Sequence, residues 1–270
     1  MLRPATPLVV LTRPRGRNQP LAARLRESGL EALELPALAV SPLPIDASRF
    51  PLPQHYDLIV FVSANAALFY LEQLAAQGCA EWPASTVAAT VGEASARPLR
   101  EAGFIPSGCI VHPAADTPQD SEALWRLLEP RRGTLRRVAI VRGESGREWL
   151  GECLERAGAR VHRYAIYRRC PSEWTDGQRQ TLAAGLAPGR VVVGLFTSSE
   201  SVDAFYQNLS APGLQTFWRD ARFVVIHERI ARHLQALLRT VPGKNPASMV
   251  KICPPADETI FQAVVSLAFL

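Results

Sequence analysis

Short apolar runs alternate with amphipathic helical stretches along the whole chain, and this alternation constrains the fold more than any other feature. The runs at 8–11 and 58–62 are continuously apolar, as in strands buried on both faces of a sheet. Apolar residues at helical spacing follow them, over 19–28 and 63–77. The alternation continues through 87–91, 93–101, 137–141, 148–157, 191–196, 199–209, 223–226, 230–238 and 250–253. Repeated strand–helix units of this length predict an α/β fold, with parallel sheets covered by helices on both faces.

Three pairs of segments resemble each other at nearly one spacing. The segment 61–74 aligns with 196–209, and 91–99 aligns with 226–234, both at an offset of 135. A third pair aligns at an offset of 129, matching Arg13 with Arg142, Leu21 with Leu150, Leu25 with Leu154 and Gly29 with Gly158. Shared periodicity alone could produce one such pair but not three in register, so the sequence predicts two similar α/β domains.

Two further segments, 33–40 and 161–171, read as extended and fit inside neither repeat. Each has a proline near its end. Two such crossings predict that the chain leaves one domain, builds the other and returns. A paired two-strand tether of this kind would allow hinge motion between the domains.

The composition excludes several protein classes. Of the 270 residues, 47% are hydrophobic and 20% are charged, which is too apolar for a disordered chain. No apolar run approaches the roughly 18 residues needed to cross a bilayer, and the first residues lack the pattern of a secretory signal. The five cysteines are scattered, so neither a metal cluster nor a disulfide framework is expected. We expect a soluble, cytoplasmic protein with no membrane partner.

The basic residues are almost all arginines. Lysine and arginine total 30, and only Lys244 and Lys251 are lysines, which leaves 28 arginines. Because the guanidinium fork binds carboxylate or phosphate through two hydrogen bonds, this bias favours an anionic partner. The alternative is a genome whose nucleotide composition favours arginine codons. The net charge of +5 is modest and aromatic residues are not interleaved with basic clusters, so nucleic acid is not an expected partner.

The familiar catalytic motifs are missing. The sequence contains no G-x-x-x-x-G-K-[ST], G-x-G-x-x-G, H-E-x-x-H or G-x-S-x-G pattern. A nucleotide cofactor, metal catalysis and a serine hydrolase therefore receive no support from the sequence.

Polar residues instead follow the predicted strands, where helices begin. Ligands of open α/β sheets bind outside the carboxyl ends of the strands, and helix N-termini there attract anions. For any single corner the alternative is simple helix capping. Five corners in two similar domains favour a cleft that holds a polyanion. These corners are Thr12–Arg13–Pro14, Ser63–Ala64–Asn65, Gly92–Glu93–Ala94–Ser95, 142–147 and Thr197–Ser198–Ser199.

Four side chains have a specific candidate role beside a structural one. Arg142 and Arg147 flank a glycine-rich turn, which fits bidentate carboxylate binding, although solvated arginines are common. Tyr167, in the returning strand, is a candidate proton donor to a leaving group, and the alternative is a buried tyrosine with a satisfied hydroxyl. His227 occupies the corner that corresponds to Gly92, where a lone histidine is often structural.

The chain resembles the uroporphyrinogen-III synthase family. The likeness is spread over nearly the whole chain and is carried by VVLTRPRGRNQPLAARL, IVFVSANAALFYL, VGEASARPLREAGF and above all VRGESGREWLGECLERAGARVHRYAIYRR. It implies two flavodoxin-like domains with parallel sheets. The first, discontinuous domain comprises 1–37 plus 170–270, and the second, inserted domain comprises 38–169. Residues 33–41 and 161–170 are the expected linker strands.

The resemblance also implies a reaction. Hydroxymethylbilane is cyclised with inversion of ring D and loss of water, mainly through positioning of the substrate in the inter-domain cleft, and no metal or organic cofactor is implied. Tyr167 matches a family tyrosine proposed to assist departure of the hydroxyl, while Ser63, Ser95 and Ser198 match cleft-lining positions. The expected substrate-binding residues are Thr12, Arg13, Ser63, Ser95, Arg142, Gly143, Ser145, Ser198, Ser199 and His227.

One corner departs from the family pattern. Residues 226–230 read IHERI where the family often has glycine and threonine, so His227 or Arg229 is expected to contact a carboxylate in place of the backbone. The family likeness further implies a monomer, with a transient contact to the upstream hydroxymethylbilane synthase. The competing hypotheses are a two-lobed sensor of a small anion and an unrelated sugar- or nucleotide-handling enzyme.

Overall fold

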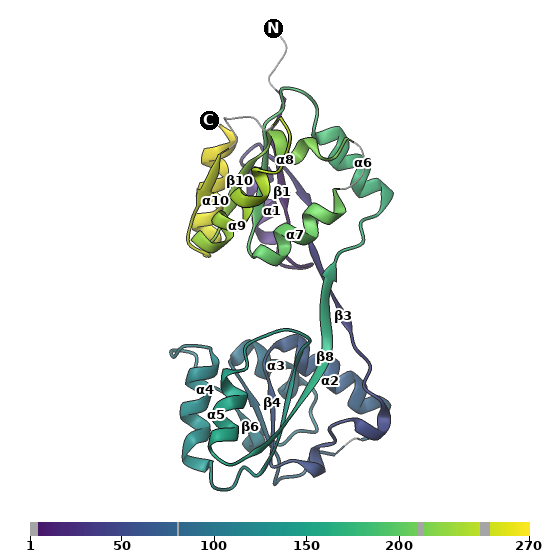
Figure 1. The fold of residues 1–270 in the computed structure, drawn as a ribbon, viewed down its shortest axis with the longest axis vertical. Coiled ribbons are helices and arrows are strands. Elements are labelled where there is room, and N and C mark those ends of the chain that lie inside the picture. Colours follow the sequence, from purple (N-terminus) through teal and green to yellow (C-terminus); the bar gives the residue numbers. More distant parts are fainter. Residues whose placement is uncertain (1–4, 80, 210–212, 244–248) are drawn as a thin grey trace. The chain divides into compact units, whose positions relative to one another are not determined.

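The computed structural model describes residues 5–79, 81–209, 213–243 and 249–270 (Figure 1). The chain divides into two compact units. Unit 1 comprises Met1–Ala39 and Cys170–Leu270, and unit 2 comprises Val40–Arg169. Among the described residues, none of the helices is both long and apolar enough to cross a membrane.

Unit 1 contains a sheet of five parallel strands within the described residues, in the order β11-β10-β9-β1-β2. Its strands are β1 (Leu8–Leu11), β2 (Glu31–Glu34), β9 (Val192–Phe196), β10 (Arg222–Val225) and β11 (Val250–Ile252). Its helices are α1 (Gln19–Glu27), α6 (Asp176–Gly185), α7 (Ser199–Asn208), α8 (Thr216–Asp220), α9 (Glu228–Leu238) and α10 (Asp257–Ala268).

Helices cover both faces of this sheet because its central strands are apolar on both sides. Successive side chains of a strand point to opposite faces. Val10 accordingly packs with residues of α6 to α9, whereas Val9 and Leu11 pack with residues of α1 and α10. All three side chains are fully buried. The continuous apolar run of β1 is thus explained by burial on both sides.

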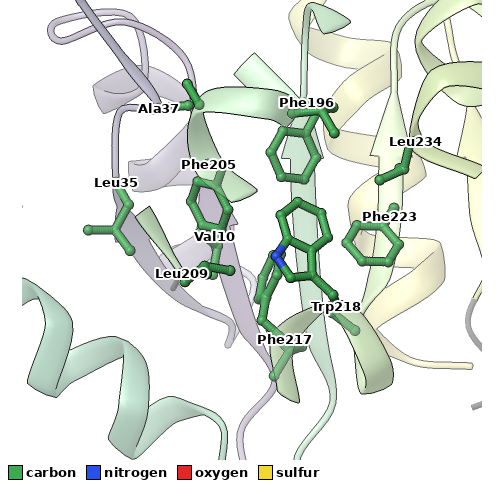
Figure 2. Packing of buried hydrophobic residues seen from close by; sticks show 14 of the residues in the cluster. Val10, Leu35, Ala37, Phe196, Phe205, Leu209, Phe217, Trp218, Phe223 and Leu234 are labelled. Atoms are coloured by element: carbon green, nitrogen blue, oxygen red, sulfur yellow. The ribbon is translucent and has the colours of Figure 1, made fainter. Parts of the chain in front are cut away.

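An aromatic cluster fills one face of the unit 1 sheet (Figure 2). The ring of Trp218 stacks on Phe196 at 5.6 Å and on Phe223 at 5.8 Å between centroids. Gly194 leaves the room for this cluster, because a Cβ atom there would lie 2.7 Å from Cζ of Phe217. The glycine in the middle of β9 is therefore a packing requirement.

Unit 2 is built on the second sheet, whose strand order within the described residues is β3-β8-β7-β4-β5-β6. Its strands are β3 (Leu38–Pro42), β4 (Leu58–Phe61), β5 (Val87–Thr90), β6 (Ile110–Val111), β7 (Arg137–Gly143) and β8 (Arg160–Pro171). Its helices are α2 (Ala64–Ala76), α3 (Glu93–Glu101), α4 (Ser121–Leu128) and α5 (Trp149–Arg156). Short 3-10 turns lie at Ala47–Arg49, Pro53–His55, Ser107–Cys109 and Glu129–Arg131. Residues of α2 and α3 pack on one face of the sheet and residues of α4 and α5 on the other.

The two sheets have the same strand order once the sequence repeats are aligned. The repeats pair β1 with β7, β9 with β4 and β10 with β5. Unit 1 then reads β2-β1-β9-β10-β11 and unit 2 reads β8-β7-β4-β5-β6. In chain order the repeat of unit 1 begins with β1, whereas that of unit 2 begins with β4, the counterpart of β9. The pair β1 and β7 and the pair β4 and β9 therefore span different parts of the chain, so their offsets of 129 and 135 need not be equal.

The predicted α/β fold with parallel sheets is confirmed, and most predicted elements lie within two residues of the observed ones. The segment predicted as one extended run over 33–40 is divided between two strands. The structure has β2 in the first sheet and β3 in the second. Pro36 lies between these strands, and the N–H groups of Leu35 and Ala37 on either side of it still donate, at 3.0 Å, to carbonyls at the end of β1 and just after it, so the chain leaves the first sheet only after Ala37. The sequence reading also missed α4, α6, α8 and β6, whose runs are short or weakly periodic.

Candidate functional site

In each unit the predicted site residues gather at the carboxyl ends of neighbouring parallel strands. In unit 2 they follow β4 and β5 or lie near the ends of β7 and β8. In unit 1 they follow β1, β9 and β10, which are also neighbours. This is the edge at which open α/β sheets bind ligands. The sets are Ser63, Ser95, Arg142, Gly143, Ser145 and Tyr167 in unit 2, and Thr12, Arg13, Ser198, Ser199 and His227 in unit 1.

Tyr167 and Ser63 form a hydrogen-bonded pair of hydroxyls. Their oxygens lie 3.1 Å apart, and Ser63 Oγ also accepts the N–H of Ala66, at 3.1 Å, as the N-cap of α2. Tyr167 is only 5% exposed. Its ring lies against Gly143, where a Cβ atom would be 2.8 Å from two ring carbons. A bulge between Arg142 and Gly143 shifts the pairing with β8 at this point, so glycine and bulge together position the tyrosine.

Arg142 already has a carboxylate partner within unit 2. Its guanidinium donates to Glu148 Oε1, and its Nε donates to the carbonyl of Gly143 at 3.2 Å. Glu148 Oε2 accepts from Arg163 at 2.8 Å, and Arg163 also pairs with Glu155 at 2.8 Å. The hydrogen bond from Arg142, with a further one from Arg163, holds the pKa of Glu148 below its ordinary value. Glu148 is therefore a positioning residue for Arg142, six residues away in the chain.

We expect Glu148→Gln to destabilise the protein by about 1–2 kcal/mol at neutral pH. The Arg142 side chain is 9% exposed and would lose its counter-charge, but the 47% exposure of Glu148 places the loss below that of a fully buried pair. Because the folded-state pKa of Glu148 is lowered, its contribution is complete above the ordinary value of 4.5 and is lost as the pH falls through the folded-state value. Urea unfolding at about pH 7 and at about pH 4 measures both effects.

Glu122→Gln is the matched control for this experiment. Glu122 pairs with Arg147, whose side chain is 64% exposed, so the same exchange breaks a solvated ion pair. Its effect on unfolding should be near zero. Equal losses for the two variants would contradict the special position of Glu148. Arg147, which the sequence offered as a carboxylate-binding residue, therefore lies in a surface ion pair with Glu122.

Ser95 lies in a corner that the structure leaves partly open. Together with Gly92 it lines a cavity of about 570 Å³ at the N-terminus of α3. Its side chain is buried, with 7% of the residue exposed. Ser145, by contrast, is exposed on the turn after β7.

Several of the predicted site residues of unit 1 have local partners. The hydroxyl of Thr12 donates to the carbonyl of Leu195 at 2.5 Å, which ties the end of β1 to β9. Arg13 pairs with Asp257 at 2.7 Å. Ser198 caps α7 by accepting the N–H of Ser201 at 3.0 Å, and Ser199 is the first residue of that helix.

His227 acts as the N-cap of α9. Its Nδ1 accepts the N–H of Arg229 at 3.0 Å. The Nδ1 atom of His227 therefore has a structural role, as a helix cap. The side chain of Arg229 is on the exposed surface.

The structure directly joins some of the predicted residues and adds one that the sequence reading missed. Tyr167 contacts Ser63 and Gly143, and Arg142 contacts Gly143. Glu148 was missed although it lies in the RGESGRE motif, because no spacing rule pairs an arginine with a carboxylate six residues later. In the described part of the chain, no three histidine, cysteine or acidic side chains are arranged to hold a metal ion.

Comparisons with known proteins agree with one another. The family model described as uroporphyrinogen-III synthase HemD matches residues 19–241. The chain is 31% identical over 219 residues to the uroporphyrinogen-III synthase of Synechococcus elongatus, covering 78% of this chain and 77% of the relative. It is 30% identical over 227 residues to that of Salmonella typhimurium, covering 83% and 88%.

Solved structures support the fold. The crystal structure of uroporphyrinogen-III synthetase from Helicobacter pylori matches with a TM-score of 0.56 at 16% identity, covering 97% of this chain and all of the other. A mutant uroporphyrinogen III synthase from Thermus thermophilus matches with a TM-score of 0.51 at 18% identity, covering 97% and 98%. The family match over most of the chain decides its membership: the protein belongs to the uroporphyrinogen-III synthase family, and it is a cyclising lyase of porphyrin biosynthesis.

Proposed function

We propose that this enzyme closes hydroxymethylbilane to uroporphyrinogen III, with inversion of ring D and loss of water, mainly by holding the linear tetrapyrrole in the conformation that leads to this isomer. Side chains at the carboxyl edges of both units bind the same substrate molecule. Loss of the substrate hydroxyl gives a reactive azafulvene, and attack on ring D gives a spiro intermediate that reopens and closes. The pyrroles supply much of the driving force for these steps.

The observation that carries this proposal is the group of anion-binding features around Ser63 and Tyr167. In the part of the chain that the structure describes, the N–H groups of Ala64 and Asn65, at the start of α2, have no hydrogen-bond acceptor. Free N–H groups at a helix N-terminus bind carboxylates. The substrate carries eight carboxylates, so its acidic side chains can be fixed at such corners while a buried hydroxyl faces the reacting chain.

Positioning is the larger of the two proposed contributions. Holding a reacting chain in the productive conformation can lower a barrier by roughly 7–11 kcal/mol. General acid catalysis contributes about 10²–10⁴-fold in rate. We assign the second role to Tyr167, whose hydroxyl lies 3.1 Å from Ser63 Oγ and can donate a proton to the departing hydroxyl.

The test is to supply hydroxymethylbilane and to separate the product isomers. We expect uroporphyrinogen III as the main product, formed faster than the spontaneous closure that gives the symmetric isomer. Formation of the symmetric isomer alone, at the uncatalysed rate, would support the anion-sensor hypothesis and contradict the enzyme proposal.

We also propose that each unit is a flavodoxin-like domain, with 1–37 plus 170–270 as the first, 38–169 as the second, and 33–41 with 161–170 as linker strands. The unit 1 order β2-β1-β9-β10-β11 is 2-1-3-4-5 when the strands are numbered in their own sequence, which supports this assignment. A cytoplasmic location stays a prediction from the composition, and a monomeric state and a transient contact with the upstream synthase stay predictions from the family likeness.

A further inference from the structure

The N-terminus of α3 is capped by a side chain from outside its own corner. Gln119 lies in the loop before α4, and its Oε1 accepts the N–H of Glu93 at 2.7 Å. Gly92 makes room for it, since a Cβ atom there would lie 2.3 Å from Gln119 Oε1. The helix has no side-chain cap from residue 92 itself. A neutral amide oxygen thus occupies a position suited to a carboxylate oxygen.

The corresponding corner of unit 1 is capped differently. There His227, the residue aligned with Gly92, supplies the acceptor from its own side chain. In unit 2 the cap crosses 26 residues of sequence and comes from an exposed side chain. Gln119 belongs to a separate loop, where its amide nitrogen donates to backbone carbonyls. Among the described residues its one hydrogen bond with the helix is that from Glu93, whereas His227 is part of its own corner.

Ser95 provides an independent sign that a ligand belongs in this cavity. The residue is more than nine-tenths buried, and its hydroxyl has no hydrogen-bond partner among the described residues. It lines the same cavity of about 570 Å³ as Gly92, Arg97 and Gln119. The Ser95 oxygen is not among the fully enclosed polar atoms, so it is accessible from the cavity, and a ligand there can accept a hydrogen bond from it.

The charges around the cavity are compatible with an anion. Glu93 is the acidic side chain of the corner, and it is paired with Arg100 and lies 3.5 Å from His112. Arg97 lines the cavity and forms an ion pair with Glu101 on the exposed surface of α3, at 3.0 Å. The two charged side chains of the lining, Glu93 and Arg97, are thus each balanced by an ion pair, so Glu93 is not a free carboxylate that would repel an anion.

We propose that Gln119 is an internal competitor of a substrate carboxylate. In the free enzyme its amide oxygen accepts the hydrogen bond from the Glu93 N–H. A carboxylate of the substrate displaces it, binds that N–H and takes the Ser95 hydroxyl as a second donor. Gln119 therefore sets the affinity of this corner for the substrate. The inference rests on the proposed function, since hydroxymethylbilane is the carboxylate-bearing ligand.

Steady-state kinetics of Gln119→Ala and Gln119→Glu test this inference. Removal of the competitor should lower the KM for hydroxymethylbilane by about two- to tenfold, the range that corresponds to one hydrogen bond between neutral groups. The carboxylate of Gln119→Glu should cap the helix more strongly and raise the KM. kcat should change little in both. Tighter binding should come with lower stability: Gln119→Ala should also lower the melting temperature, because α3 loses its cap.

Thr117→Ala is the matched control. The Thr117 hydroxyl donates to the carbonyl of Ala114 at 2.7 Å in the same loop, and the side-chain amide of Gln119 donates to the carbonyls of Ala114 and Thr117. Loosening the loop without touching Glu93 should leave the KM unchanged. A purely structural role predicts a raised KM for Gln119→Ala and for Thr117→Ala alike.

The outcomes separate this inference from the proposed function. A wild-type protein that does not turn over hydroxymethylbilane contradicts the function. An active wild type with an unchanged or raised KM in Gln119→Ala overturns the inference alone. If Gln119→Ala does not fold, Gln119→Glu decides: an unchanged or lower KM in that variant overturns it.

Discussion

Replacement of Phe196 by alanine is expected to lower the free energy of unfolding by about 3–5 kcal/mol, the usual cost of removing a buried phenylalanine ring. Phe196 is fully buried in unit 1. Its ring stacks on Trp218 at 5.6 Å and meets Phe205 edge-on at 5.3 Å (Figure 2). The surrounding rings are held by one another, so they can refill the cavity only partly. Urea unfolding followed by tryptophan fluorescence measures the loss.

Phe269→Ala is the control for this experiment. It removes the same ring from the same unit, but Phe269 is 62% exposed. Its expected cost is within about 0.5 kcal/mol, as for other surface substitutions. A Phe196→Ala loss below about 1.5 kcal/mol would show that the aromatic cluster collapses into the space, and that the rigid packing inferred from the ring geometry is wrong.

The fold was predictable wherever a strand is buried on both faces. The runs that became β1, β4 and β9 are continuously apolar, and continuous apolar runs bounded by helical stretches leave few alternatives. The edge strand β6 comprises only Ile110–Val111 and is half-buried, so it has no comparable pattern. The division into β2 and β3 has no local signal, because both parts are extended, and it becomes visible only when the strands that pair with each part are known.

The candidate site was predictable in place but not in its contacts. Strand ends followed by Ser63 or Ser198 are local patterns, and both residues cap helices as such patterns indicate. The partner of Arg142 and the cap of α3 depend on the tertiary fold. Glu148 meets Arg142 across the turn between β7 and α5, and Gln119 reaches Glu93 from another loop. No spacing rule connects residues that are joined only by the packing of separate elements.

Tyr167→Phe should lower kcat by about 10²-fold, the low end of the range for general acid catalysis, and should change the KM by less than about threefold. The low end is expected because the pyrroles supply much of the driving force for loss of the hydroxyl. The variant keeps the ring against Gly143 and beside Phe69, whose ring centroid is 6.1 Å away, so the pocket shape is preserved. A loss in kcat with little change in KM marks a group that acts in the transition state.

Tyr164→Phe separates this chemistry from the loss of any tyrosine hydroxyl on β8. Tyr164 lies three residues earlier on the same strand, and its hydroxyl is 2.7 Å from that of Tyr56. Removing it should cost about 1 kcal/mol of stability and leave kcat unchanged. If Tyr167→Phe keeps kcat within about twofold of the wild type, the hydroxyl pair with Ser63 serves the structure, and positioning by the corners accounts for the catalysis alone. If both variants lose kcat equally, the damage comes from β8 and not from a missing proton donor.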